Sequence, residues 1–343
     1  MRRLPILATA LLVSASGVRA DVPNIVVDIP PVFSLVSSVM QGVGTPKLLL
    51  RGNESPHNFA LRPSQRRDLG QADIIFWIGD GLTPWLEKAQ ASLTQTPISV
   101  ALGEQTGVVQ LSFREGAFFE AHDEHDEHDE HDGHDEVNGH TEHNHAETHE
   151  NAAAHDGKDH QDHAGHDHSG LDPHFWLDPE NAIHWIYTIA DILSQKDPEN
   201  AGTYYANATR TKASLELLNK NIAQQLAPHR AERFLIVHDA FQYFEARFGL
   251  AAQGAISDGH AAPPSAARIL AIRKLIQNQK ISCVFAEPGY NAKLLDNLIS
   301  ETSVRLKQLD PLGAGLPLDH TLYEAVLQNM ADMMVACFTN DEG

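Results

Sequence analysis

Several features that define other classes of protein are missing from this chain of 343 residues. Beyond its first twenty positions, no stretch approaches eighteen uninterrupted apolar residues, so the sequence predicts no permanent membrane anchor. No Gly-x-x-x-x-Gly-Lys-Ser/Thr sequence occurs, so any ATP hydrolysis linked to its function must belong to a partner. No His-Glu-x-x-His sequence occurs either, which argues against a zinc hydrolase.

Basic residues are also few. The 25 Lys and Arg against 46 Asp and Glu give a formal charge of −21, which argues against a nucleic-acid partner because a polyanion would be repelled. One stretch sets this charge: residues 120–170 hold 17 acids, one lysine and 14 of the 21 histidines. The other positions carry 29 acids and 24 bases. We expect the acidic stretch to be unstructured, because it has too little apolar surface to offset the entropy of ordering.

The first twenty residues have the parts of a secretory signal peptide. Arg2 and Arg3 give a positive start, residues 6–13 are apolar, and residues 18–20 place small side chains before the expected cleavage at Asp21. We therefore expect a mature chain in the periplasm. No cysteine lies at the cleavage site, so a lipid anchor is not indicated.

Only two cysteines are present, Cys283 and Cys337. An even number in an oxidising compartment suggests a disulfide, which would close a loop of about 54 residues and stabilise the fold by up to roughly 4 kcal/mol. Two buried free thiols are the alternative.

Short apolar segments alternate with helical patterns, first before the acidic stretch and again after it. Strands that are apolar on both faces are typical of parallel sheets covered by helices. The predicted fold class is α/β, with two lobes that each hold a four-stranded, mostly parallel sheet flanked by helices, joined by one long backbone helix. The predicted strands are 24–29, 47–51, 73–78, 97–101, 234–238, 251–256, 281–286 and 304–309. The predicted domains are a signal peptide at 1–20, an N-terminal lobe at 21–196 that includes 120–170, a linking helix at 197–227 and a C-terminal lobe at 228–343.

Four potential metal ligands follow predicted strands or the end of the acidic stretch. His57 follows the second strand, His174 stands where the acidic stretch ends, His238 closes the strand at 234–238, and Asp310 directly follows the strand at 304–309. Ligands of α/β proteins gather beyond the carboxyl ends of the strands, so these side chains are expected at one crevice. Three imidazoles and a carboxylate form a ligand set suited to Zn²⁺.

Four sequence motifs surround these residues. They are Ser-Pro-His-Asn-Phe-Ala-Leu-Arg-Pro-Ser at 55–64, Asp-Pro-His-Phe-Trp-Leu-Asp-Pro at 172–179, Val-His-Asp-Ala-Phe at 237–241 and Leu-Asp-Pro-Leu-Gly at 309–313. The motifs resemble those of a known family, the periplasmic metal-binding proteins of ATP-binding-cassette (ABC) importers, in particular the high-affinity zinc-uptake type, and the likeness covers nearly all of the mature chain.

This resemblance implies one tightly bound Zn(II) between the two lobes, with His57, His174 and His238 as ligands and Asp310 as the candidate fourth. Manganese-importing relatives place a carboxylate where this chain has His238, and three nitrogens favour zinc over Mn²⁺. Some zinc-type relatives carry a glutamate where this chain has Pro56, which leaves the fourth position open between Asp310, a water molecule and no ligand. The resemblance also implies the Cys283–Cys337 disulfide of the zinc-type subgroup.

Within the acidic stretch, histidines recur every three residues among aspartates and glutamates. Such a tract offers many weak combinations of imidazole and carboxylate, so we expect additional weak zinc sites that gather or buffer the ion; incidental metal binding by a solvated loop is the alternative. The residues concerned are His122, His125, His128, His131 and His134.

The sequence thus predicts a monomeric, non-enzymatic binding protein that presents zinc to a membrane permease with a separate ATPase. A periplasmic zinc chaperone is a further candidate partner. The alternatives are an extracytoplasmic metal buffer, a manganese- or iron-type metal-binding protein and, least favoured, a secreted zinc hydrolase.

Overall fold

The computed structural model describes residues 22–114, 116, 118–119, 170–257, 259, 263–290, 292–300 and 302–340. All of these residues belong to one compact unit. Among them, no helix is both long and apolar enough to cross a membrane. The predicted signal peptide at 1–20 and the histidines of the acidic stretch lie outside the described residues.

The first sheet has four parallel strands in the order β2-β1-β3-β4. The inner strands β1 and β3 consist of buried apolar residues, as expected when helices cover both faces of a parallel sheet. Each helix of this part begins with a proline, whose fixed φ and missing N–H suit the first helical turn. The elements are β1 (Ile25–Val27), α1 (Pro30–Val39), β2 (Lys47–Leu48), α2 (Pro63–Gly70), β3 (Ile74–Trp77), α3 (Pro84–Gln90), β4 (Ile98–Ala101) and a 3₁₀ turn (Leu102–Glu104).

The second sheet repeats this order with β6-β5-β7-β8, again with every strand parallel to its neighbours. The predicted pair of four-stranded sheets is therefore confirmed, and both are entirely parallel in their strand pairing. The elements are β5 (Phe234–His238), α6 (Gln242–Phe248), β6 (Ala255–Ser257), α7 (Ala266–Asn278), β7 (Cys283–Ala286), α8 (Ala292–Ile299), β8 (Arg305–Gln308) and α9 (Leu322–Thr339).

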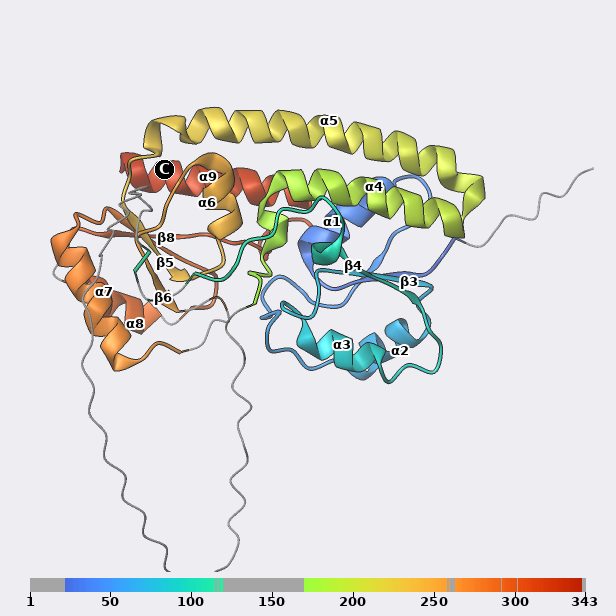
Figure 1. Cartoon of the computed structure of the whole chain (residues 1–343), viewed down its shortest axis with the longest axis horizontal. Coiled ribbons are helices and arrows are strands. Elements are labelled where there is room, and N and C mark those ends of the chain that lie inside the picture. The colour runs from blue at the N-terminus through green and yellow to red at the C-terminus, as the bar shows by residue number, and fades with distance from the viewer. Residues whose placement is uncertain are drawn as a thin grey trace, which may run out of the picture. The chain divides into compact units, whose positions relative to one another are not determined.

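A long helix lies between the two sheets in the sequence. After α4 (Pro179–Lys196) and a 3₁₀ turn (Pro198–Asn200), α5 (Ala201–Leu226) runs for 26 residues and ends in a second 3₁₀ turn (Ala227–His229). It packs against α1, α4 and α9, and Figure 1 shows it running above α4 and α9. The predicted long linking helix is confirmed, and its buried face carries leucine and isoleucine at three- and four-residue spacing. That face consists of Leu215, Leu218, Ile222 and Leu226.

The helix α5 begins later than the sequence predicts, because Asp197 starts a turn instead. Its carboxylate accepts hydrogen bonds from the Asn200 amide at 2.7 Å and from the Tyr204 hydroxyl at 2.8 Å. These side-chain bonds join Asp197 to the end of the short 3₁₀ turn and to the first turn of α5, so they stabilise the turn ahead of Ala201.

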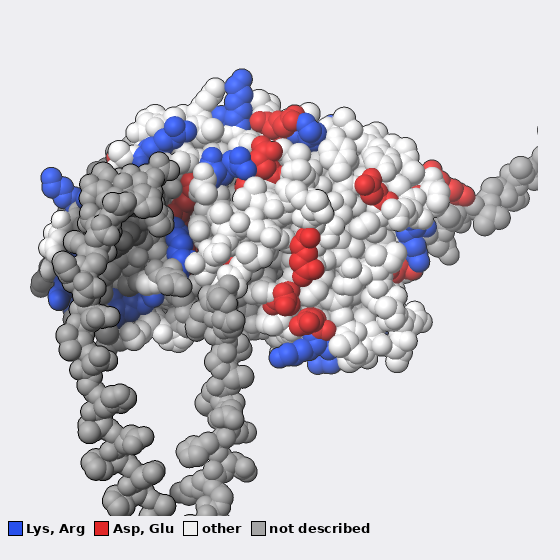
Figure 2. Space-filling model, in the orientation of Figure 1, with Lys and Arg blue, Asp and Glu red and all other residues white. Residues whose placement is uncertain are grey.

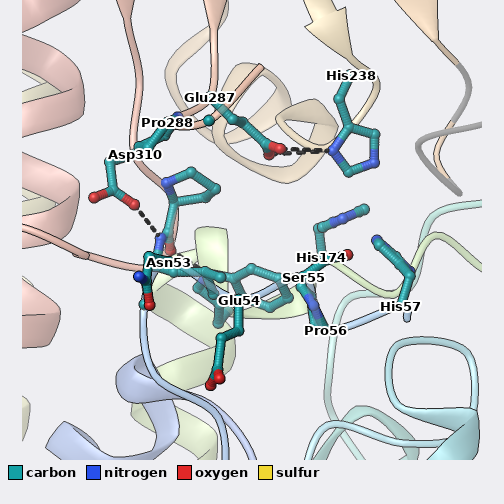
Figure 3. A pocket seen from close by; sticks show the side chains of 15 residues that line it. Asn53, Glu54, Ser55, Pro56, His57, His174, His238, Glu287, Pro288 and Asp310 are labelled. Atoms are coloured by element: carbon teal, nitrogen blue, oxygen red, sulfur yellow. Dashed lines mark hydrogen bonds and ion pairs between the residues drawn. The ribbon is translucent and has the colours of Figure 1, made fainter. Parts of the chain in front are cut away.

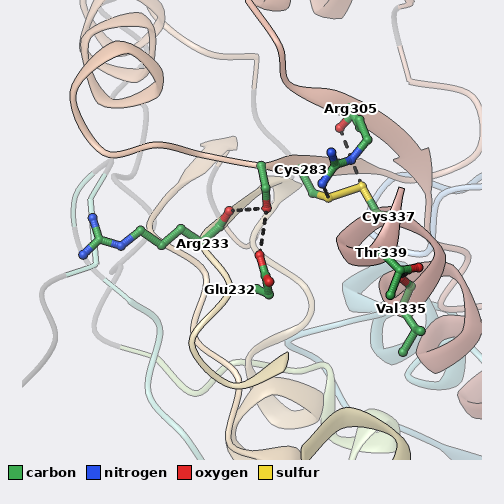
Figure 4. Close-up of a disulfide and its surroundings, with 8 residues drawn as sticks. Glu232, Arg233, Cys283, Arg305, Val335, Cys337 and Thr339 are labelled. Atoms are coloured by element: carbon green, nitrogen blue, oxygen red, sulfur yellow. Dashed lines mark hydrogen bonds between the residues drawn. A yellow bond between two sulfur atoms is a disulfide. The ribbon is translucent and has the colours of Figure 1, made fainter. Parts of the chain in front are cut away.

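The two cysteines form a disulfide. Cys283 at the start of β7 is bonded to Cys337 near the end of α9, with a Cα–Cα distance of 6.2 Å (Figure 4). The predicted pairing is therefore confirmed, and it attaches the last helix to an inner strand of the second sheet.

Charged side chains outside the acidic stretch are mixed in sign. On the face shown in Figure 2, scattered basic and acidic side chains lie among neutral ones. This agrees with the near balance of 29 acids and 24 bases outside residues 120–170.

Candidate metal centre

His57 lies in the loop between β2 and α2 of the first sheet. Its position is fixed from both sides of the loop by the indole of Trp85, which belongs to α3. The indole N–H donates to the carbonyl of Pro56 at 2.7 Å, and the Phe59 ring packs on the same indole with centroids 5.1 Å apart. Because the chain on both sides of His57 contacts Trp85, the loop that carries His57 can shift only a little.

His174 lies at the entrance to the 3₁₀ turn Phe175–Leu177 and is only 2% exposed. One carboxylate oxygen of Asp172 lies 2.7 Å from its ring Nδ1 and also accepts the His174 backbone N–H at 3.0 Å. A carboxylate on Nδ1 orients the ring and makes Nε2 the nitrogen suited to a metal. The Tyr323 hydroxyl donates to the carbonyl of Trp176 at 2.8 Å and so holds the turn from α9.

His238 is the last residue of β5 and is 4% exposed. The neighbouring strand β7 is followed directly by Glu287, whose two carboxylate oxygens both lie 3.1 Å from Nδ1 of His238. The Gly259 carbonyl lies 3.1 Å from the other ring nitrogen, Nε2. The pair His238–Glu287 therefore sits where the strand order reverses, the place at which open α/β sheets bind their ligands.

These contacts favour a protonated His238 in the absence of metal. Burial acts to lower its pKa, but Glu287, the Gly259 carbonyl and Asp239 together raise the pKa to about 9. Burial acts to raise the pKa of Glu287, yet the adjacent imidazole holds it below its usual range. A metal ion that binds His238 must therefore replace a proton.

The three imidazoles converge, although His57 is separated from the other two by more than a hundred residues. Their ring centroids are 5.1 to 5.6 Å apart, and one potential ligand atom from each ring lies within 4.8 Å of the others. Nitrogens of a tetrahedral zinc with ~2.05 Å bonds are about 3.3 Å apart, so shifts on the order of an ångström complete the coordination. Figure 3 shows the rings of His57 and His174 below that of His238 at one side of the pocket.

Asp310 lines the same pocket but does not join this group of three. Its carboxylate accepts backbone N–H bonds from Leu312 at 3.0 Å, Gly313 at 2.8 Å and Ala314 at 2.5 Å. The turn after β8 is thus capped by the side chain that the sequence offered as a fourth ligand (Figure 3). Gly313 has a φ of +75°, a conformation that favours glycine and that this tight turn requires.

The histidines that the sequence nominated as metal ligands fall into two sets. In the described part of the chain, His57, His174 and His238 are the one group of His, Cys, Asp or Glu side chains with ligand atoms so close together. The predicted weak sites at His122, His125, His128, His131 and His134 lie outside the described residues.

Two carboxylates that orient the ligands were not predicted as site residues. Asp172 and Glu287 each approach Nδ1 of a candidate ligand. A signal existed for both: Asp172 stands two residues before His174, and Glu287 directly follows the predicted strand at 281–286, just as His238 closes the predicted strand at 234–238. A carboxylate at either place is suited to fix the tautomer of a ligand histidine.

Two parallel sheets flanked by helices bring three buried or half-buried imidazoles to one pocket, from loops and from the end of a strand. This arrangement defines a metal-binding protein of the two-lobed, solute-binding class. The chain belongs to the ZnuA family, because the family model described as zinc-uptake complex component A, periplasmic, matches residues 25–337.

Relatives of the same description span almost the whole chain. It is 40% identical over 335 residues to the high-affinity zinc uptake system protein ZnuA of Brucella suis, which covers 97% of both chains. It is 41% identical over 337 residues to the protein of that name from Paracoccus denitrificans, with 98% of both chains covered. A crystal structure of ZnuA matches with a TM-score of 0.66 at 23% identity, over 91% of this chain and 99% of that one, a likeness of fold.

Proposed function

We propose that this protein captures one Zn²⁺ ion in the periplasm, using His57, His174 and His238, and delivers it to the membrane permease of an ABC importer. The observation that carries the proposal is the convergence of these three imidazoles from loops of both sheets. Membership of the ZnuA family supports zinc as the ion and uptake as the process.

Zinc is favoured by the type of ligand atom. Three imidazole nitrogens suit a borderline-soft ion, whereas Mn²⁺ prefers sites rich in oxygen. The carboxylates of Asp172 and Glu287 face ring Nδ1 atoms, where they orient the ligands and raise their basicity.

The fourth coordination position is proposed to hold a solvent molecule. Coordination by Asp310 would require its carboxylate to give up backbone N–H donors that it binds in the turn after β8. Leaving buried or half-buried donors unsatisfied costs about 1–3 kcal/mol each, which opposes such a change. A solvent ligand also leaves a position open for exchange, which suits a protein that must release its ion.

The expected partners are a permease and its separate ATPase. Secretion through the predicted signal at 1–20 would place the chain beside the outer face of the permease. We propose that it acts as a monomer, because a single chain supplies all three imidazoles, and that a periplasmic zinc chaperone is a possible donor of the ion.

A metal analysis of purified protein lacking residues 120–170 tests the central proposal. One zinc per chain, resistant to a moderate chelator, is expected, and His174→Ala should abolish it. The matched control is His184→Ala, because His184 is exposed on α4 and belongs to no metal group among the described residues. Equal zinc retention by His174→Ala and His184→Ala would refute the assignment.

The acidic stretch is proposed to collect zinc at weak sites around the tight one. Its 14 histidines and 17 acids create a cation-attracting field that salt weakens. Cells that carry the chain without residues 120–170 should take up zinc more slowly under severe starvation, and normally when zinc is plentiful. Unchanged uptake under starvation would eliminate a delivery role for the stretch.

A further inference from the structure

The chain on either side of the acidic stretch forms a short antiparallel ribbon. Ser112 forms a β-bridge with Leu171, and the backbone N–H of Asp172 donates to the Leu111 carbonyl at 2.8 Å. This pairing matters for the metal centre because Asp172 orients His174. A contact that fixes residues 111–114 therefore also fixes the position of the candidate ligand His174.

Arg114 anchors this ribbon to the second sheet. Its guanidinium donates to the Asp239 carboxylate through Nε at 3.0 Å and through Nη2, and to Glu245 through Nη1 at 2.8 Å and Nη2 at 3.1 Å. The side chain of Arg114 is 16% exposed, and those of Asp239 and Glu245 are 4% and 3% exposed. The guanidinium also stacks on the Phe119 ring, 3.9 Å from its centroid. Forked, largely desolvated bonds of this kind fix geometry more strongly than exposed ion pairs do.

The contacts of Arg114 and of its ribbon involve residues next to two of the imidazoles. Asp239 directly follows His238 at the end of β5, so the bonds from Arg114 fix the backbone beside that ligand. On the other side, the Tyr243 hydroxyl donates to the Asp172 carbonyl and accepts from the Leu111 N–H, both at 2.9 Å. The ribbon that carries Arg114 is thereby held to the same helix, α6, that follows His238.

We propose that Arg114 is a positioning residue of the zinc site, which sets the distance between His174 and His238 by bonding Asp239 and Glu245. This inference rests on the proposed function, because it assigns Arg114 to the same three-imidazole site. Arg114 acts through the residues beside two of the imidazoles, Asp239 next to His238 and Asp172 next to His174.

Charge and positioning predict opposite results for the removal of Arg114. As a nearby positive charge, the guanidinium repels Zn²⁺, and its loss exposes two carboxylates, so simple electrostatics predicts tighter binding. As a positioning residue, its loss separates the ribbon from α6 and spreads the two ligands, so binding becomes weaker. The direction of the change in affinity therefore distinguishes the two roles.

The test compares Arg114→Gln and Arg114→Lys with Arg247→Gln. Arg247 is the matched control, because it lies on α6 and its fork bonds the Asp178 carboxylate at 2.7 Å with both nitrogens, away from Asp172 and Asp239. Zinc affinity is measured by chelator competition, and the visible spectrum of the Co²⁺ form reports the coordination geometry. Thermal unfolding of each zinc-free variant measures stability separately.

We expect Arg114→Gln to weaken zinc binding about 10- to 100-fold and to change the Co²⁺ spectrum, as the loss of groups that orient metal ligands does. Arg114→Lys keeps the charge but cannot bond both carboxylates with a fork, so its affinity should be intermediate. Arg247→Gln should lower the unfolding temperature but change zinc affinity by less than about threefold, since its fork bonds neither Asp239 nor the ribbon that carries Asp172.

Zinc binding by Arg114→Gln as tight as in the wild type, or tighter, would overturn the proposal. So would an equal loss of affinity in Arg247→Gln. Should Arg114→Gln fail to fold, Arg114→Lys decides by the same criteria, with wild-type affinity and an unchanged Co²⁺ spectrum as the contrary result. Failure of the proposed function itself is a different outcome, in which the wild type and Arg247→Gln also hold no zinc.

Discussion

The Glu287 carboxylate faces Nδ1 of His238 across the boundary between two adjacent parallel strands, with both oxygens 3.1 Å from the ring. This contact performs two opposite tasks. It orients the imidazole for a metal, and it retains a proton on the ring when no metal is bound.

The zinc affinity of Glu287→Gln at different pH values distinguishes the orienting role of Glu287 from its effect on the proton of His238. Well above pH 9, where the wild-type ring has lost its proton, the proton no longer competes, so the variant should bind zinc about 10-fold more weakly because the ligand loses its charged partner. Near pH 7 the difference should shrink, because the variant has less proton competition to overcome. Chelator competition at both pH values measures this, with Glu216→Gln as a control from the exposed side of α5. A deficit that stays constant with pH would contradict the proton-holding role.

In the wild type, zinc affinity should rise with pH up to about 9. Each zinc that binds His238 displaces one proton while the pKa of the ring is about 9, so the apparent affinity should increase up to about tenfold per pH unit between 7 and 8. Calorimetry in buffers of different ionisation enthalpy should detect the release of about one proton from this residue. Zinc affinity that is flat over this range would count against ligation by His238.

The stability of the zinc-free protein should change in the opposite direction. The pKa of His238 is raised on folding, so its contribution is fully present below its unfolded pKa of about 6.5 and is lost as pH rises through about 9. Denaturant unfolding of the zinc-free chain should therefore show a decrease in the free energy of unfolding between pH 6.5 and 9. His238→Gln should remove this part of the pH dependence, and its persistence in that variant would assign it to another group.

Asp310→Ala should reduce stability more than zinc binding. Removing the carboxylate leaves the N–H groups of Leu312, Gly313 and Ala314 without their acceptor, which should lower the free energy of unfolding by about 1–3 kcal/mol. The zinc affinity of the folded variant should change less than about threefold if solvent fills the fourth position. A loss of two orders of magnitude, with Asp310→Asn equally affected, would show that Asp310 coordinates the ion.

Loss of the disulfide should destabilise the fold and leave the site in place. Cys283 and Cys337 are 54 residues apart in sequence, and a loop of that size corresponds to about 4 kcal/mol on the chain-entropy model. Paired Cys283→Ser and Cys337→Ser changes should lower the free energy of unfolding by about 2–4 kcal/mol, with the zinc affinity of the folded fraction unchanged. Because Glu287 lies four residues after Cys283, a parallel fall in zinc affinity would indicate instead that the bond also positions the site.

Much of the fold could be predicted because local sequence signals and tertiary packing agree. The predicted strand at 234–238 has the observed bounds, since a run of buried apolar residues marks it. The predicted strand at 251–256 is wrong at its start. Gly254 forms a bridge with Phe118 from a distant segment, and β6 begins only at Ala255, which no local pattern indicates.

The candidate site, like the fold, could be predicted from the sequence only in part. His57, His174 and His238 stand in sequence motifs that follow a strand, follow the acidic stretch and close a strand, respectively, so residue type and place were sufficient to nominate them. Asp310 has an equally suggestive place, but its carboxylate turns to the backbone N–H groups of its own turn, and only coordinates reveal that choice. Arg114 carries no motif, because its role depends on carboxylates more than a hundred residues away.

The amino-acid sequence by itself determined the two parallel sheets, the long helix and the residue types available to a metal. Hydrophobic periodicity, prolines and positions at strand ends are local properties of the sequence. Tertiary structure decided which of those side chains meet. That outcome depends on how loops separated by over a hundred residues pack together, and on which hydrogen-bond donors each carboxylate meets in the folded chain.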